Sequence, residues 1–232
     1  METLVSYRLE EKLAVVTMDD GKVNALSLPM LMELNAALGR ARADRAPVVI
    51  TGRDGIFSAG FDLAMLRSGH YEALEMIRAG FELAERILAF PAPVVIAVPG
   101  HAVAMGLFLV LSGDYRIGAD GPYKLTANEV AIGLTMPRAA VEILRQRLTP
   151  AAFNRTVTLA EPFSPSSAVD AGMLDQVVAP AKLAEAAHDI GALLGALDME
   201  AHAASKLRAR GQSLLALRAA IEADFSELRA TL

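Results

Sequence analysis

The stretch from Pro93 to Gly133 constrains the fold most, because it predicts a buried strand that leads through a tight turn into a helix. Val94 to Val98 is a short β-branched apolar run, and Pro99-Gly100 separates it from a second apolar run, Ala102 to Leu111. The second run is long enough for a helix. The start of such a helix carries free backbone N–H groups, which can hold an anion or an oxygen that becomes negative during a reaction.

Composition then bounds the class of protein. A chain of 232 residues with 53% hydrophobic content can bury a sizeable core as one domain. The net charge of −5, with Lys and Arg scattered along the chain, disfavours nucleic acid as a partner. Cysteine is absent and no pair of histidines has metal-ligand spacing, so we expect neither a disulfide framework nor a metal site. The sequence shows no signal-peptide pattern and no apolar window long enough to cross a membrane, so we expect a soluble cytoplasmic protein.

Hydrophobic periodicity and capping signals predict most of the remaining elements. The expected strands are residues 4–9, 13–18, 48–51, 115–119 and 174–178. The expected helices run from Ser27 (or a cap at Asn24) to near Asp44, over 71–90 and 137–148, from Thr149, from Ser164 to near Gly172, and over 181–196.

The C-terminal segment predicts a long amphipathic helix from Asp198 onward. We expect a core of residues 1–195 followed by this helical segment, residues 196–232. Its apolar stripe consists of Leu214, Leu217, Ile221, Phe225, Leu228 and Leu232. A continuous apolar stripe is unfavourable in water, so it needs a surface to cover, in its own chain or on a neighbouring subunit. We expect it to be covered within a trimer of identical chains.

The loop predicted over residues 52–63 is a second candidate functional segment. It is rich in glycine and small residues, yet it contains Phe57 and Phe61, which a merely solvated loop would not favour. Loops that carry function usually follow the strands of a rigid scaffold. A plain connection into a helix capped by Asp62 would explain the same sequence. A functional loop here could face the turn at residues 99–106 across one cleft.

Glu129 is the carboxylate for which a catalytic interpretation is strongest. It precedes the apolar residues Val130-Ala131-Ile132. A carboxylate enclosed by apolar groups has a raised pKa and is a stronger base than one in water, whereas a glutamate at a loop tip is simply solvated. Asp114, just before a strand, is expected to be structural, and His101 is given no role.

Together these segments resemble the enoyl-CoA hydratase/isomerase, or crotonase, superfamily. The resemblance covers about residues 4–195 and rests on three segments, Ile56 to Leu63, Pro93 to Gly100 and Gly113 to Ile117. Three segments are most similar to the mitochondrial-type Δ3,Δ2-enoyl-CoA isomerase: Asn24 to Leu28, Phe57 to Leu63 and Asn128 to Gly133. The resemblance implies an α/β fold, a spiral of β-β-α units, with a helical C-terminal region that assembles chains into a homotrimer or a dimer of trimers.

The resemblance also assigns chemical roles. It implies that the backbone N–H groups of Phe61 and Met105 form an oxyanion hole for the thioester oxygen, which gains negative charge when a proton is removed beside it. Each such donor is typically worth about 10²–10³ in rate. Met105 replaces the glycine usual at its position, but any residue except proline supplies the N–H. Glu129 matches the acid/base glutamate of the family. Family hydratases use a second glutamate, and Phe108 stands at its position here.

The substrate contacts follow from the same resemblance, which implies binding by Ala25, Leu26, Ala59, Gly60, Asp62, Leu63, Gly106 and Phe108. The adenine end of CoA is expected against the loop before Phe61, held by backbone groups of residues 25–26 and 59–63, with Lys22 or Arg53 near a phosphate. Small residues there permit close backbone approach. The coenzyme A thioester is then the substrate, and no further cofactor is expected.

Three functional interpretations remain open. An isomerase that moves a 3-enoyl-CoA double bond to the 2-position needs one base, which Glu129 supplies. Hydration, or another crotonase reaction such as thioester hydrolysis or decarboxylation, would use a different set of groups, and Glu33, Asp62 or the C-terminal helix could supply a second acid. A non-catalytic acyl-CoA-binding protein would keep the pocket without the chemistry. The presence of Glu129 favours an enzyme, and the missing second glutamate favours isomerisation over hydration.

Overall fold

The computed structural model describes residues 3–68 and 71–230. Its strands are β1 (Val5–Glu10), β2 (Leu13–Met18), β3 (Val48–Thr51), β4 (Gly55–Ser58), β5 (Val94–Val98), β6 (Gly100–Val103), β7 (Tyr115–Ala119), β8 (Leu125–Thr126) and β9 (Gln176–Val178). Its helices are α1 (Leu28–Ala43), α2 (Leu63–Ser68), α3 (Tyr71–Leu88), α4 (Met105–Ser112), α5 (Arg138–Arg145), α6 (Pro150–Leu159), α7 (Pro165–Asp170), α8 (Leu183–Gly195) and α9 (Met199–Arg229). Two short 3₁₀ turns are η1 (Val130–Ile132) and η2 (Pro180–Lys182).

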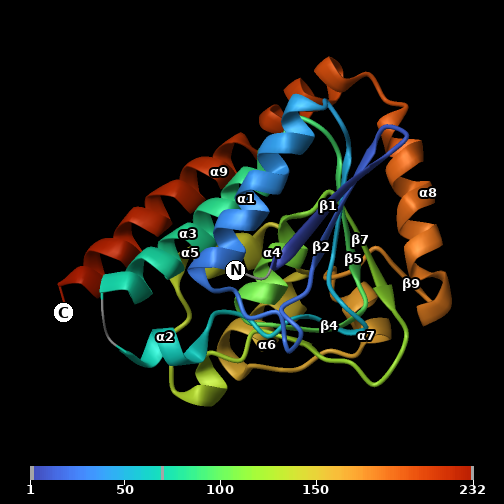
Figure 1. Cartoon of the computed structure of the whole chain (residues 1–232). Coiled ribbons are helices and arrows are strands. Elements are labelled where there is room, and N and C mark those ends of the chain that lie inside the picture. The colour runs from blue at the N-terminus through green and yellow to red at the C-terminus, as the bar shows by residue number, and fades with distance from the viewer. Residues whose placement is uncertain (1–2, 69–70, 231–232) are drawn as a thin grey trace.

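The strands of the described chain form two sheets (Figure 1). The larger has the order β1-β2-β3-β5-β7-β9 and is parallel except for the β1–β2 hairpin. The smaller has the order β4-β6-β8 and is parallel throughout. Each strand of the smaller sheet follows a strand of the larger one in the sequence, so the chain winds as a spiral. This is the α/β architecture expected from the sequence.

Both faces of the larger sheet are covered. One face joins the main core, to which α1, α3 and α4 contribute. On the other face α8 places Leu183 and Ala187 against Val95 and Ile117. Because both faces are buried, β3 and β5 read as continuous apolar runs rather than as alternating patterns. Ser27, Thr149 and Ser164 form the helix caps predicted from the sequence, and Asp198 caps α9 at the residue from which that helix was expected.

The helix predicted from Ala102 to Leu111 was wrong for its first three residues. Ala102 and Val103 belong to β6 and pair with Leu125 and Thr126 of β8. Ala104 then adopts a positive φ of 49°, which separates the strand from α4. An apolar run alone cannot separate a short buried strand from a buried helix, and the partner strand lies about twenty residues away.

The loop predicted over residues 52–63 also differs from the structure. Residues Gly55–Ser58 form β4, which pairs with β6. Phe57 is fully buried in the main core. The unexpected aromatic residue in this loop is therefore explained by packing. Only residues 59–62 remain as a connection into α2.

Helix α9 lies along α3 and α5 of its own chain (Figure 1). Two stripe residues, Leu217 and Ile221, are only 1% and 4% exposed. Phe225 is half-buried beneath the Arg78 guanidinium, 4.7 Å from the ring centroid, and Leu232 lies outside the described residues. The same chain therefore covers most of this stripe, which is one of the two possibilities given from the sequence, and coverage within a trimer stays a prediction.

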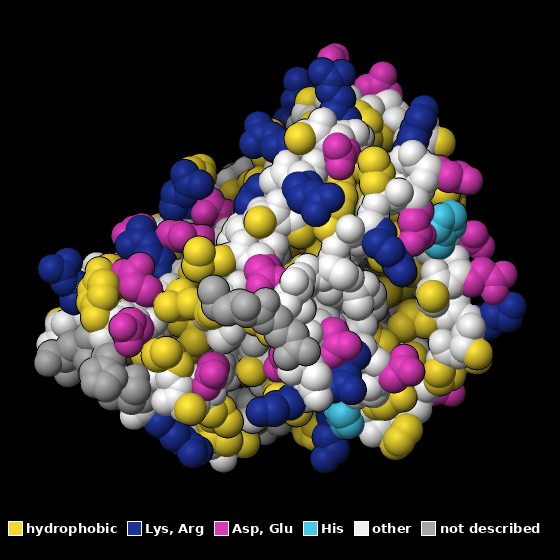
Figure 2. All heavy atoms as spheres, in the orientation of Figure 1, with side chains coloured by type: hydrophobic (Ala, Val, Ile, Leu, Met, Phe, Trp, Pro, Cys, Tyr) yellow, Lys and Arg dark blue, Asp and Glu magenta, His cyan; other side chains and the backbone are white. Residues whose placement is uncertain are grey.

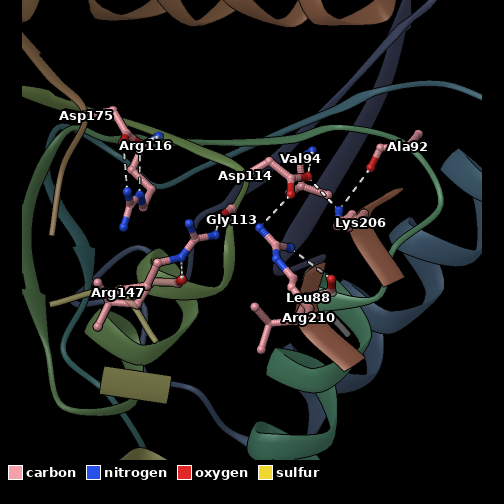
Figure 3. A network of polar contacts seen from close by, with 11 residues as sticks. Leu88, Ala92, Val94, Gly113, Asp114, Arg116, Arg147, Asp175, Lys206 and Arg210 are labelled. Atoms are coloured by element: carbon pink, nitrogen blue, oxygen red, sulfur yellow. Dashed lines mark hydrogen bonds and ion pairs between the residues drawn. The ribbon is translucent and has the colours of Figure 1, made fainter. Parts of the chain in front are cut away.

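Asp114 anchors the first half of α9 to the larger sheet (Figure 3). Its carboxylate lies 2.6 Å from Lys206 Nζ and 2.9 Å from Arg210 Nη2, and it accepts a hydrogen bond from the Val94 N–H at 2.8 Å. Lys206 is buried, and burial lowers its pKa to about 8. The structural role predicted for Asp114 is confirmed.

Two further features concern the surface charges and the hydropathy of the helices. On the face drawn in Figure 2, Lys and Arg side chains alternate with Asp and Glu side chains, without a continuous basic stripe on that face. Among the described helices, none is long and apolar enough to cross a bilayer.

Candidate active site

The candidate site is built at the carboxyl ends of the three parallel strands of the smaller sheet. Phe61 follows the end of β4, Met105 follows the end of β6, and Glu129 follows the end of β8. Neighbouring parallel strands end at the same edge of a sheet, which is where ligands bind in many α/β folds. The strand pairing therefore places the three residues named from the sequence at one edge.

The Met105 N–H is presented by a strained turn. Met105 is the first residue of α4, so its N–H has no acceptor within the helix. The preceding residue, Ala104, has a φ of 49° and is held by its N–H, which donates to the Thr126 carbonyl at 2.9 Å. A non-glycine residue in this conformation is strained, and such strain is concentrated at functional sites.

The Phe61 N–H lies on a loop that touches the Met105 turn. Leu26 and Phe61 form a parallel bridge in which the Leu26 N–H donates to the Gly60 carbonyl at 2.8 Å. This pattern turns the Phe61 N–H away from Leu26. Gly60 has a φ of +89°, and a Cβ there would lie 3.0 Å from the Val103 oxygen and 3.4 Å from the Met105 nitrogen. Only glycine permits this approach, so the loop that carries Phe61 packs directly against the Met105 turn. The cleft that the sequence suggested between the two loops stays a prediction.

A buried polar network, which no local sequence pattern indicates, supports the Phe61 loop. Ser58 Oγ donates to the Asn24 carbonyl at 2.7 Å and accepts from the Gly60 N–H at 3.1 Å. Asn24 Nδ2 donates to the Met18 carbonyl at 3.0 Å and the Phe57 carbonyl at 3.1 Å. Asn24 also has a φ of 51°, a conformation in which asparagine is enriched. The sequence predicts Asn24 as an alternative helix cap, a role that Ser27 fills.

Glu129 is a buried carboxyl group with a perturbed pKa. The residue is 8% exposed, and burial raises its pKa from 4.5 to about 7, with a smaller opposing effect from its own backbone N–H. Its Oε2 has no hydrogen-bond partner within the described chain. The predicted cause of this burial was wrong, because Val130 and Ile132 are 42% and 53% exposed. The protein interior, rather than its neighbours in sequence, encloses Glu129.

Phe108 lies in the core behind the site. It is 1% exposed and stacks on Phe81 with 6.1 Å between ring centroids. Gly106, on the same helix, is required by packing, since a Cβ there would lie 2.6 Å from the Ser58 oxygen. The position at which a family hydratase carries its second glutamate therefore holds a buried ring.

The acids that could have replaced this glutamate have other partners. Glu33 Oε2 accepts from the Leu4 and Val5 N–H groups, each at 2.9 Å. Asp62 Oδ1 accepts from the Ala64 N–H at 2.8 Å and caps α2, as predicted. On the C-terminal helix, Asp224 accepts from the Ala139 N–H at 2.9 Å. Each of these carboxylates has a structural role.

The remaining predicted substrate residues lie on the two segments joined by the bridge. Leu26 is buried, Ala25 and Ala59 are partly exposed, and Leu63 is 52% exposed at the start of α2. Arg53 Nη1 donates to the Lys22 carbonyl at 3.1 Å and so braces the loop that carries Lys22. These positions are compatible with a ligand that runs along both segments.

A separate cavity of about 560 Å³ lies between α8 and the larger sheet. Its lining includes Arg8, Thr51, Tyr123 and His188, but not Phe61, Met105 or Glu129. Phe61, Met105 and Glu129 follow adjacent strand ends, and Glu129 is a carboxyl group with a raised pKa. A perturbed pKa marks a candidate reactive site more specifically than volume does, so we take the strand ends as the candidate active site.

The spiral of β-β-α units, with Phe61, Met105 and Glu129 at adjacent strand ends, is consistent with the resemblance to acyl-thioester enzymes noted in the sequence. Comparison with known proteins agrees: the family model described as enoyl-CoA hydratase/isomerase matches residues 8–231. The chain belongs to the enoyl-CoA hydratase/isomerase family, the crotonase superfamily.

Both names within this family occur among similar proteins. A probable enoyl-CoA hydratase of Bacillus subtilis is 30% identical over 174 residues, covering 73% of this chain and 67% of that protein. The human mitochondrial enoyl-CoA delta isomerase 1 is 32% identical over 176 residues, covering 71% of this chain and 56% of that protein. A solved structure of a Mycobacterium tuberculosis enoyl-CoA isomerase has a TM-score of 0.94 and 45% identity, covering 98% of this chain and 100% of that chain. A second structure of the same protein names it a probable enoyl-CoA hydratase. The names therefore fix the family and its acyl-CoA chemistry but not the individual reaction.

Proposed function

We propose that the protein is an acyl-CoA isomerase that converts a 3-enoyl-CoA to the conjugated 2-enoyl-CoA with Glu129 as its single proton carrier. Two features together support the proposal. Glu129 is buried and its pKa is raised to about 7, and Phe108, also buried, stands where hydration would need a second acid. A base with a pKa near the working pH transfers protons in both directions.

The proposed reaction balances with one carboxylate. Glu129 takes the proton from the carbon beside the thioester carbonyl, and the C–H electrons move into a dienolate whose oxygen becomes negative. The N–H groups of Phe61 and Met105 would stabilise that oxygen. Glu129 then returns the proton two carbons further along, and the remaining double bond is conjugated with the carbonyl. No proton is gained or lost, and no water takes part.

Hydration is the main alternative, and it needs more than Glu129. Addition of water requires one group to deprotonate the water while a proton is delivered to carbon. A phenyl ring cannot take either role, and a dry pocket favours a lone carboxylate as base and protects a dienolate from solvent. The acids considered as replacements, Glu33, Asp62 and Asp224, are engaged elsewhere.

We also propose the placement of the substrate. The adenine end of CoA would lie against the loop before Phe61, using backbone groups of residues 25–26 and 59–63, with Lys22 near a phosphate. Support comes from the parallel bridge between Leu26 and Phe61, which joins the two segments side by side. If free CoA failed to compete with an acyl-CoA in a binding assay, this placement would be wrong.

Replacement of Glu129 by Gln tests the proposed role directly. Gln keeps the shape and removes the base, so turnover of a 3-enoyl-CoA should fall by about 10²–10⁴-fold while the Kd of a saturated acyl-CoA stays close to that of the wild type. Glu222→Gln, at an exposed position on α9, is the matched control and should leave turnover unchanged. Near-normal turnover in Glu129→Gln would place the base elsewhere, and a protein that binds acyl-CoA without any turnover would be a carrier.

A further inference from the structure

Gly80 lies in the middle of α3, outside both loops that carry the proposed oxyanion donors. A Cβ at Gly80 would lie 2.5 Å from Cε1 and 2.5 Å from Cζ of Phe61, far inside contact distance. The same Cβ would lie 3.5 Å from Cγ of Met105, an ordinary contact. The missing side chain of this one residue therefore faces both residues whose N–H groups would bind the thioester oxygen.

The Phe61 ring is partly buried, and an aromatic neighbour limits its movement on one side. Its edge packs against Phe81, with 6.2 Å between ring centroids and an interplanar angle of 73°. Phe81 in turn stacks on the buried ring of Phe108. Beside Phe61, one hydrogen bond links the backbone to the neighbouring segment, from the Leu26 N–H to the Gly60 carbonyl. Since close-packed interiors transmit displacement, a group that pushed the ring would also move the Phe61 backbone.

We propose that Gly80 is a positioning residue of the oxyanion hole. Its lack of a Cβ lets the Phe61 ring rest directly on the α3 backbone, and this contact sets the Phe61 N–H relative to the Met105 N–H. Helix propensity argues against glycine in the middle of a helix, so the contact with Phe61 is the feature that requires it. The inference rests on the proposed function only in that these two N–H groups bind the thioester oxygen.

Gly80→Ala is the first test. A displaced oxyanion donor should lower turnover of a 3-enoyl-CoA by about 10- to 100-fold, with KM for the same substrate within a few-fold of the wild type and an unchanged circular dichroism spectrum. Gly211→Ala in α9, where a Cβ would meet nothing within 4 Å, is the matched control and should keep wild-type turnover. Wild-type turnover in Gly80→Ala would overturn the proposal.

Phe61→Leu separates a positioning role from general disruption of α3. Leucine removes the Cε1 and Cζ atoms that the added methyl group would strike, and it keeps the backbone N–H. Gly80→Ala should therefore cause no further loss of turnover in a Phe61→Leu background, which is a large coupling between the two positions. If Gly80→Ala alone failed to fold, the double variant should still fold. Equal losses in both backgrounds, or failure of the double variant to fold, would contradict the proposal.

A spectroscopic measurement separates this proposal from the isomerase assignment. Two hydrogen bonds to a thioester oxygen lower the infrared C=O stretching frequency of bound butyryl-CoA labelled with ¹³C at the carbonyl, whatever reaction the enzyme performs. We expect a shift in the wild type and a smaller one in Gly80→Ala. A full shift in Gly80→Ala would refute the positioning role and leave the isomerase assignment intact. A wild-type shift without isomerisation would refute only the reaction, and no shift in the wild type would refute both.

Discussion

Burial of Glu129 lowers the stability of the folded protein when its carboxyl group is ionised. Burial raises its pKa from 4.5 to about 7. Between these two values the folded state binds more protons at this group than the unfolded state does, so stability falls as the pH rises through that window. Above pH 7 the full penalty is present, and a shift of this size corresponds to about 3 kcal/mol.

The first prediction at this scale is that Glu129→Gln is more stable than the wild type at pH 8. The advantage should approach about 3 kcal/mol at pH 8 and shrink toward zero at pH 4.5, because the neutral amide has no proton to lose. Urea unfolding at both pH values measures it, with Glu222→Gln as the control for a general charge effect. An advantage of the same size at both pH values would show that Glu129 is not buried as a titrating acid.

Residues whose roles depend on local chemistry could be predicted from the sequence, and those whose roles depend on packing could not. Phe61, Met105 and Glu129 stand in motifs that can be read in order along the chain. Gly80 gave no such signal, because a glycine within a helical pattern looks the same whether or not an aromatic ring lies on it. Asn24 was ambiguous for a related reason, since asparagine suits both a helix cap and a strained turn.

At the scale of elements, the boundary between β6 and α4 shows what the sequence lacks. Ala102 to Leu111 is uniformly apolar, so its division depends on β8, which pairs with the first residues and leaves the rest to form the helix. By contrast, the capped helices have local signals and were predicted to within a few residues. The coverage of α9 by α3 and α5 is again a tertiary fact that its own periodicity could not reveal.

The docking of α9 yields a prediction of its own. Asp114→Asn would leave the buried Lys206 ammonium and the Arg210 guanidinium without their anion, and should cost about 3 kcal/mol in unfolding free energy. The loss should lie at the lower end of the usual range because Lys206, with a pKa of about 8, can release its proton.

Glu222→Gln on the same helix is the matched comparison. It breaks an exposed ion pair with Arg78 at the same distance of 2.6 Å, and should cost about 1 kcal/mol or less. Chemical unfolding at pH 7 measures both variants. Equal losses would mean that the buried cluster does not anchor α9.

At the scale of the whole molecule, the order of strands in the two sheets could be expected only through the resemblance to a family. No local pattern specifies that β4, β6 and β8 form a second sheet instead of joining the larger one. This arrangement brings the three site residues to one edge. The fold could therefore be predicted from the family, whereas the strand pairing explains why the three site residues lie at one edge.

We still predict a homotrimer or a dimer of trimers, for a different reason from the stripe on α9. Val130, Ile132 and Leu134 are apolar and between 42% and 53% exposed, close together in the segment after Glu129. Apolar side chains gathered in this way are favourable when a second subunit covers them. Light scattering at micromolar concentration should give a mass of three or six chains. A clean monomer would contradict the prediction.

The reaction itself is tested most directly by offering the wild-type enzyme two substrates under one set of conditions. Conjugation of a 3-enoyl-CoA and hydration of crotonyl-CoA both change the absorbance of the conjugated thioester, so one preparation and one instrument measure both rates. With Glu129 as the single proton carrier and Phe108 in place of a second acid, isomerisation should be faster than hydration by at least about 100-fold, the usual contribution of one acid/base group. Hydration as fast as isomerisation, or faster, would contradict the assignment.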